Sequence, residues 1–157
     1  MADYNGDGKL DLIINNNNAA PTIYLNALKN VGSCIEMKLV GTRSNRDAVG
    51  ARVRLALAGK TLTRQVEAGS GYASEAMLPV HFGLGDAASI ESVEITWPDG
   101  FVQRFKGAQI DPFIDRMVQI EEGNDHLAEF TAAHTPPHLV ASMSNAKRTS
   151  LGATSPQ

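Results

Sequence analysis

The sequence predicts an all-β protein, and three observations support this prediction. Apolar and polar residues alternate with a period of two in several segments between residues 33 and 122, as in strands with one buried face. Turn sequences rich in Gly, Asp and Pro separate these segments. No segment of useful length repeats its apolar residues with the period of an amphipathic helix. The expected architecture is a compact domain of packed antiparallel strands, a β-sandwich.

The first segments with strand character lie near the N-terminus. Leu12–Ile14 is predicted as a short buried strand and Thr22–Leu25 as a second one. The loop between them contains four consecutive asparagines, which favour turns and left-handed backbone. Two strands are not stable alone in water. Residues 1–29 are therefore predicted to be part of a larger β unit whose other strands lie outside this chain.

The strands of the main domain are expected to pair as hairpins. Ala58-Gly59-Lys60 allows one tight turn, and Pro98-Asp99-Gly100 makes another, in which Pro presets φ and Gly takes a positive φ. Trp97 alternates with apolar neighbours, which favours a place in the core over a role as a sugar-binding platform. The predicted strands are residues 35–39, 52–57, 61–67, 93–97, 101–105 and 117–120.

Two glycine-rich joints and a polar tail complete the chain. Residues 69–72 and 81–85 are predicted to connect the hairpins. After Glu122 the chain is rich in Ser, Thr, Ala, Pro and His, so residues 123–157 are predicted to form a disordered tail. A short helix over residues 125–133 is the alternative for its first part.

Composition and charge exclude several classes of function. The 157 residues carry a net charge of −3, which gives no general attraction for nucleic acid or a membrane surface. No apolar run approaches the roughly 18–20 residues that span a bilayer, so membrane insertion is not expected. The single cysteine, Cys34, excludes an internal disulfide and a cysteine-rich zinc site.

The strongest chemical signal is an oxygen-rich loop at the N-terminus. Ca²⁺ prefers about 6–8 oxygen ligands at flexible angles, and Gly8 allows the turn that brings such ligands together. The loop is not an EF-hand, because Ile14 occupies the position of the bidentate glutamate. The alternative is an ordinary turn, in which these residue types are common. The predicted Ca²⁺ ligands are the side chains of Asp3, Asn5, Asp7 and Asp11 and the backbone carbonyl of Lys9.

A second candidate is an anion-binding face. Residues 38–64 contain seven basic side chains and one acidic side chain. Arg52 and Arg54 share one face of a strand, the hairpin is expected to bring Arg64 near them, and Arg46 lies in the preceding turn. Arginine suits the carboxylates and sulfates of acidic polysaccharides. The alternatives are a solvated sheet face and, for Arg46, an ion pair with the neighbouring aspartate.

Catalysis is not expected. Ser70 lies between glycines and His81 follows, but Gly69-Ser70-Gly71 is not a Gly-x-Ser-x-Gly elbow. Gly83-Leu84-Gly85 lacks the third glycine and the βαβ setting of a dinucleotide site. His81 is expected to pack beside its aromatic neighbour in a strand.

Two groups of motifs resemble known families. The loop Asp3-x-Asn5-x-Asp7-Gly8-x-x-Asp11-Leu12 resembles the calcium loop of FG-GAP/VCBS repeats, which form integrin-like β-propellers. Four motifs between residues 30 and 122 resemble the ASPIC/UnbV domain in order and spacing. They are Ser44–Val53, Gly69–Tyr72, His81–Gly85 and Val93–Gly100. Such domains follow a propeller in secreted or surface proteins, including the cartilage acidic protein family.

The resemblance implies three parts: a partial propeller blade (1–29), an ASPIC/UnbV-like β domain (30–122) and the tail (123–157). It implies a noncatalytic binding or adhesion module that is extracellular, on the cell surface or periplasmic, with its signal peptide upstream of residue 1. Ca²⁺ would brace the propeller edge. The expected partners are upstream propeller blades and an unknown extracellular protein or acidic glycan. The alternative is a carbohydrate-binding accessory domain or a cryptic enzyme acting on acidic polysaccharide.

Overall fold

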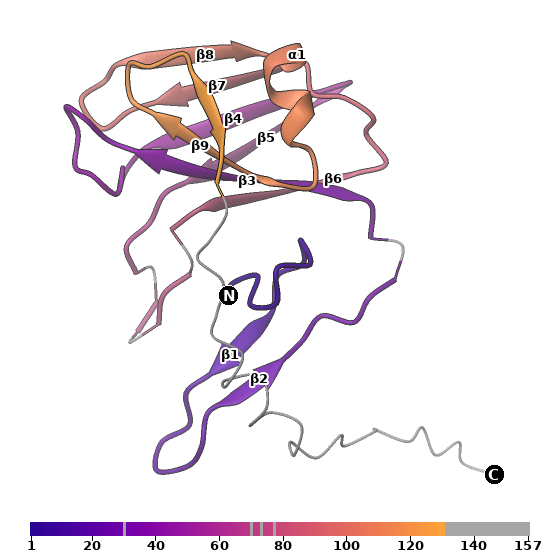
Figure 1. The fold of residues 1–157 in the computed structure, drawn as a ribbon. Coiled ribbons are helices and arrows are strands. Elements are labelled where there is room, and N and C mark those ends of the chain that lie inside the picture. The colour runs from indigo at the N-terminus through magenta and orange to yellow at the C-terminus, as the bar shows by residue number, and fades with distance from the viewer. Residues whose placement is uncertain (30, 70, 73, 77, 131–157) are drawn as a thin grey trace.

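The alternating segments of the sequence form two four-stranded sheets that pack face to face (Figure 1). The computed structural model describes residues 1–29, 31–69, 71–72, 74–76 and 78–130. One sheet contains β3 (Ser33–Val40), β6 (Val80–Gly85), β9 (Met117–Glu121) and β10 (Leu127–Glu129). The other contains β4 (Arg52–Leu57), β5 (Lys60–Gln65), β7 (Ser92–Thr96) and β8 (Val102–Lys106). The all-β prediction is confirmed.

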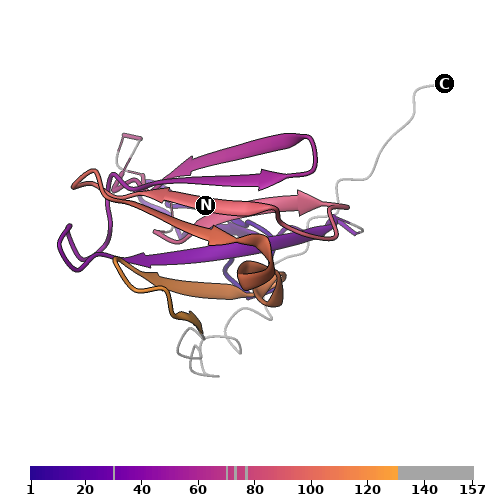
Figure 2. The same cartoon turned by 90° about the horizontal axis from the view of Figure 1, so that it is seen from above.

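The strand order is β10-β9-β3-β6 in the first sheet and β5-β4-β7-β8 in the second. Neighbouring strands are antiparallel except β3 and β9, which are parallel. The chain passes from the second sheet to the first through the short helix α1 (Gly107–Ile110) and the 3-10 turn η1 (Asp111–Phe113), seen from above in Figure 2. No helix in the described ranges has the length and hydropathy to cross a membrane.

The hydrophobic core lies between the two sheets. Val53, Leu55 and Leu57 of β4 point into it, while Arg52 and Arg54 on the same strand stay exposed. The expected core position of the tryptophan is confirmed, because Trp97 is 2% exposed. Burial of each large apolar side chain stabilises the fold by about 1.5–3 kcal/mol.

Two segments differ from their sequence predictions. Residues 81–85 were expected to be a joint, but they belong to β6, since Phe82 and Leu84 alternate into the core. The predicted tail from residue 123 contains β10, which pairs antiparallel with β9. Leu127 packs against the core, and this contact favours a strand over a tail or helix there. Residues 131–157, where the tail prediction continues, lie outside the described residues.

The N-terminal hairpin consists of β1 (Leu12–Ile14) and β2 (Thr22–Tyr24), which pair antiparallel. In Figure 1 it stands apart from the two large sheets. The prediction of a buried first strand is wrong, because Leu12, Ile13 and Ile14 are 44%, 44% and 39% exposed. Neither large sheet covers the hairpin, so its apolar side chains face solvent.

Candidate metal loop and its junction with the β domain

The loop before β1 folds around the carboxylate of Asp3. Its Oδ1 accepts hydrogen bonds from the backbone N–H groups of Gly6 and Asp7 at 2.8 and 3.1 Å. Its Oδ2 accepts one from the N–H of Gly8 at 2.8 Å. Gly6 and Gly8 have φ values of 72° and 80°, which glycine adopts without strain. The pattern of Asp, Asn and Gly therefore produces a tight turn that the Asp3 carboxylate closes.

Asp7 is the exposed carboxylate of this turn. Its Oδ1 accepts a hydrogen bond from the N–H of Lys9, and its Oδ2 lies 2.8 Å from the Lys9 ammonium. The hydrogen bond from the Lys9 side chain holds the pKa of Asp7 below its usual value. Asn5 accepts a hydrogen bond from the Asp7 N–H through Oδ1. Asp7 is thus held as an anion beside a second oxygen donor.

Asp11 has a different environment from the other predicted ligands. It is 1% exposed, and its two oxygens accept hydrogen bonds from the N–H groups of Tyr4 and Asn26 at 3.0 and 2.8 Å. These bonds tie the loop to the residues that follow β2. A carboxylate has about four lone-pair sites, so both oxygens keep capacity for a cation.

The donor chemistry of the loop fits a hard cation, because every donor is an oxygen. In the part of the chain that the structure describes, however, no group of three or more His, Cys, Asp or Glu side chains is arranged to hold a metal ion. Full coordination would require the Asn5 amide, the Lys9 carbonyl and a turn of Asp7 away from the Lys9 ammonium. The calcium site stays a prediction.

The loop rests on the outer face of the first sheet, opposite the core. Nε2 of His81 lies 2.8 Å from the carbonyl oxygen of Gly8. Because a carbonyl only accepts, Nε2 carries the proton. A Cβ at Gly8 would lie 2.8 Å from Sγ of Cys34, so only glycine allows this approach. Burial, reinforced by nearby carboxylates, raises the pKa of the Cys34 thiol to about 11, which keeps it protonated and unreactive.

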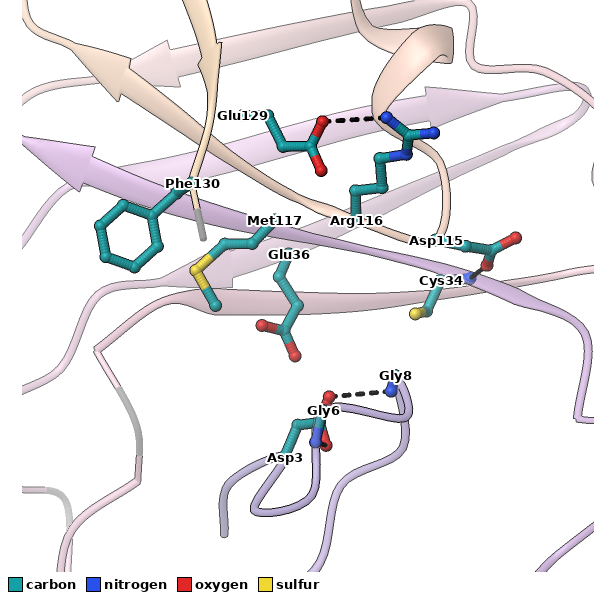
Figure 3. A pocket seen from close by; sticks show the side chains of 10 residues that line it. All are labelled: Asp3, Gly6, Gly8, Cys34, Glu36, Asp115, Arg116, Met117, Glu129 and Phe130. Atoms are coloured by element: carbon teal, nitrogen blue, oxygen red, sulfur yellow. Dashed lines mark hydrogen bonds and ion pairs between the residues drawn. The ribbon is translucent and has the colours of Figure 1, made fainter. Parts of the chain in front are cut away.

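A cavity of 330 Å³ lies between the loop and this sheet (Figure 3). Its charged lining residues are the acids Asp3, Glu36, Asp115 and Glu129 and the base Arg116. Arg116 is bound to Glu129 at 2.9 Å. The cavity therefore has an excess of negative charge.

Glu36 is a buried acid of this cavity that the sequence analysis did not single out. It is 5% exposed, and within the described residues its Oε1 has no hydrogen-bond partner. Burial raises the pKa of Glu36 and the charge of Asp3 raises it further, while His81 acts in the opposite direction. In the sequence Glu36 is only a polar residue of an alternating strand, and no local signal shows that residues 3–8 cover it.

The arginines of the predicted anion-binding face are divided between two faces. Arg54 lies 3.4 Å from Glu94 and therefore has a local counter-charge. Arg64 pairs in register with the buried Val53, so it points to the opposite face of the sheet from Arg54. Its guanidinium lies 5.8 Å from the ring centre of Phe82. The hairpin was expected to bring Arg64 near Arg52 and Arg54, but it places Arg64 on the opposite face, because directly paired residues of antiparallel strands project from the same face.

Arg46 lies in the loop of residues 41–50, where its backbone carbonyl accepts a hydrogen bond from the N–H of Gly41. Ser70, which sequence analysis considered and rejected as a nucleophile, lies outside the described residues.

Comparison with known proteins matches the domain part of the chain. A family model described as "ASPIC and UnbV" matches residues 41–126. Cartilage acidic protein 1 from Mus musculus is 39% identical over 105 residues, covering 64% of this chain and 16% of that protein. The Homo sapiens protein has the same identity, with 15% of its length covered. Cartilage acidic protein 1 from Xenopus tropicalis is 34% identical over 122 residues, covering 73% of this chain and 18% of that protein.

The chain thus spans less than a fifth of the length of these relatives. The family match does not reach residues 1–29, so the FG-GAP/VCBS resemblance of the N-terminal loop stays a prediction. The matched residues contain β4 to β9 and all four motifs of the predicted signature. On this match, the chain belongs to the ASPIC/UnbV family.

Proposed function

We propose that the chain is a noncatalytic binding module of an extracytoplasmic protein, in which Ca²⁺ bound by residues 3–11 braces the N-terminal hairpin. The observation that supports this most directly is the oxygen-rich turn around Asp3, which places the Gly8 carbonyl in contact with His81 of the β domain. An ion at this turn would stiffen residues 3–11, the loop that precedes the hairpin and contacts the β domain.

The expected Ca²⁺ affinity of the loop agrees with a location outside the cell. An exposed loop with few carboxylates and an internal ammonium competitor binds Ca²⁺ weakly, in the range of about 10⁻⁴–10⁻³ M typical of extracellular modules. Such a site fills outside the cell and stays empty at cytosolic Ca²⁺ levels. The relatives named cartilage acidic protein 1 also support a place outside the cell.

The exposed hairpin supports a larger assembly. Tyr24, Leu25 and Leu28 are 58%, 53% and 66% exposed, beside the exposed apolar residues of β1. Tyr24 pairs in register with Leu12 of β1, and exposed apolar side chains that lie together usually mark a contact. We propose that further strands of a propeller blade cover it in the full-length protein, as the FG-GAP/VCBS resemblance implies. The binding partner of the module is then an extracellular protein or an acidic glycan.

Calcium titration by calorimetry tests the loop. We expect the wild-type chain to bind Ca²⁺ with a Kd of about 10⁻⁴–10⁻³ M. Asp7→Ala should weaken binding at least tenfold, since it removes the exposed carboxylate ligand, an effect of about 1.4 kcal/mol. Asp86→Ala, which removes an exposed acid outside the loop, is the matched control and should bind as wild type does. Identical heats from wild type and Asp7→Ala would remove the metal assignment.

An activity screen tests the noncatalytic assignment. Nε2 of His81 donates a hydrogen bond to the carbonyl oxygen of Gly8, so this nitrogen is not free to act as a general base. We expect no turnover of generic ester or glycoside substrates by the purified chain, with or without added Ca²⁺. Turnover that survives further purification would favour the enzyme alternative.

A further inference from the structure

We infer that Glu36 of β3 is a ligand of the same cation from the domain side, so that one ion bridges the N-terminal loop and the β domain. The inference rests on the proposed function, because it adds a ligand to the proposed calcium loop. Ion binding would then hold the N-terminal loop against the β domain.

The first step of the argument is the environment of Glu36. Glu36 is 5% exposed, and its Oε1 has no hydrogen-bond partner within the described residues. A buried carboxylate without a partner is strongly unfavourable unless a proton or a cation neutralises it. Figure 3 shows the Glu36 carboxylate pointing out of the sheet toward the turn of Asp3 and Gly6.

The second step is the surrounding charge. The neighbouring groups already have partners: Arg116 binds Glu129 at 2.9 Å, and Asp115 accepts hydrogen bonds from the backbone N–H of Cys34 and the hydroxyl of Ser33. None of these brings a positive charge to Glu36. The Asp3 carboxylate, which accepts three backbone N–H hydrogen bonds, faces Glu36 across the cavity and adds a second negative charge there.

His81 is the remaining nearby base, and its ring contacts the loop. His81 pairs in register with Glu36, so both side chains project from the same face of the sheet. Nε2 of His81, however, donates to the carbonyl oxygen of Gly8 at 2.8 Å. His81 thus fixes the position of the loop over Glu36, and the oxygen of Glu36 is left for another cation.

The chemistry of the donors selects the ion. Asp3 of the loop and Glu36 of β3 line the same cavity from opposite sides. Two such carboxylates, completed by other oxygen donors of the loop and by water, would suit a hard divalent cation such as Ca²⁺. Because no group of three or more acids among the described side chains is arranged to hold a metal ion, the loop must rearrange around the ion, with Asp7 turning away from the Lys9 ammonium. Water must complete the coordination shell, which agrees with weak binding.

The test compares Glu36→Gln with Glu91→Gln, the same change at an exposed glutamate outside the junction. With CaCl₂ as titrant, Glu36→Gln should weaken binding about tenfold or more, and Glu91→Gln should leave it unchanged. Without Ca²⁺, Glu36→Gln should raise Tm, because it removes an uncompensated buried charge. Added Ca²⁺ should then raise Tm less than it does in wild type.

Terbium luminescence gives a readout that a merely structural role would not change. Decay rates of bound Tb³⁺ in H₂O and D₂O report the metal-bound waters, whose number should rise in Glu36→Ala because water replaces the lost ligand. An unchanged water count, or wild-type Ca²⁺ affinity in Glu36→Gln while Asp7→Ala loses binding, overturns the Glu36 ligand and leaves the loop proposal intact. Failure of the wild-type chain to bind Ca²⁺ overturns both.

Discussion

Glu122→Ala is expected to lower the free energy of unfolding by about 3 kcal/mol, because it removes a buried carboxylate that accepts several part-buried hydrogen bonds. Glu122 is 3% exposed. Its Oε2 accepts hydrogen bonds from the backbone N–H groups of Thr42, Arg43 and Ser44 at 2.9, 2.8 and 2.8 Å. Its Oε1 accepts one from the Ser44 hydroxyl at 3.0 Å. A single carboxylate at the end of β9 thus holds the start of the loop that carries the Ser44–Val53 motif.

The same contacts make stability depend on pH. Burial alone would raise the pKa of Glu122, but the hydrogen bonds from Ser44, Thr42 and Arg43 lower it from 4.5 to about 2. Because the folded-state pKa lies below the unfolded-state value, the stabilisation is complete above about pH 4.5 and disappears as the pH falls toward 2. Urea unfolding at several pH values between 7 and 2 measures this loss.

The neighbouring Glu121→Ala is the matched control, since Glu121 is only partly buried. It should change the free energy of unfolding by less than about 1 kcal/mol. Glu122→Gln should show a flatter dependence on pH between 5 and 2 than wild type, because its side chain does not titrate. If Glu122→Gln and wild type lose stability in parallel over that interval, other carboxylates control the acid transition.

The strands of the sandwich were predictable because the alternation of apolar and polar residues within one short segment shows which face of the strand is buried. Val53, Leu55 and Leu57 alternate with exposed or half-buried neighbours, and the structure places them in the core as that pattern requires. The turn around Asp3 was predictable for a similar reason, because its glycines and acceptor side chains lie within a few residues of one another in the sequence.

The junction was not predictable, because it depends on contacts between distant segments. Gly8, Glu36 and His81 meet only after β3 and β6 have paired and the loop has docked on them. No residue near Glu36 in the sequence distinguishes it from a solvated strand residue. The strand β10 was missed for a similar reason, since it is short and exists through pairing with β9.

Trp97→Ala is expected to lower the free energy of unfolding by about 4 kcal/mol. Trp97 is the single tryptophan of the chain, and it is 2% exposed in the core between the sheets. Its removal leaves a large cavity and also takes away the Nε1–H that donates to Oε1 of Gln103 at 3.0 Å. Gln103 in turn donates to the carbonyl of Asn124 at 2.7 Å, so the indole supports the turn between β9 and β10.

Trp97→Phe separates the two contributions, because it keeps an aromatic ring and removes the N–H. In this variant Oε1 of Gln103 still accepts a hydrogen bond from the N–H of Gly123 at 3.2 Å, so the oxygen keeps one of its two donors. We therefore expect Trp97→Phe to lower the free energy of unfolding by about 2 kcal/mol. Urea unfolding followed by circular dichroism measures all variants, since the two Trp97 variants have no tryptophan fluorescence. Phe101→Ala, at a 37% exposed ring beside Arg43, is the control and should cost about 1 kcal/mol or less. If Trp97→Phe costs as much as Trp97→Ala, the hydrogen bond to Gln103 dominates; if it costs nothing, packing alone accounts for the effect.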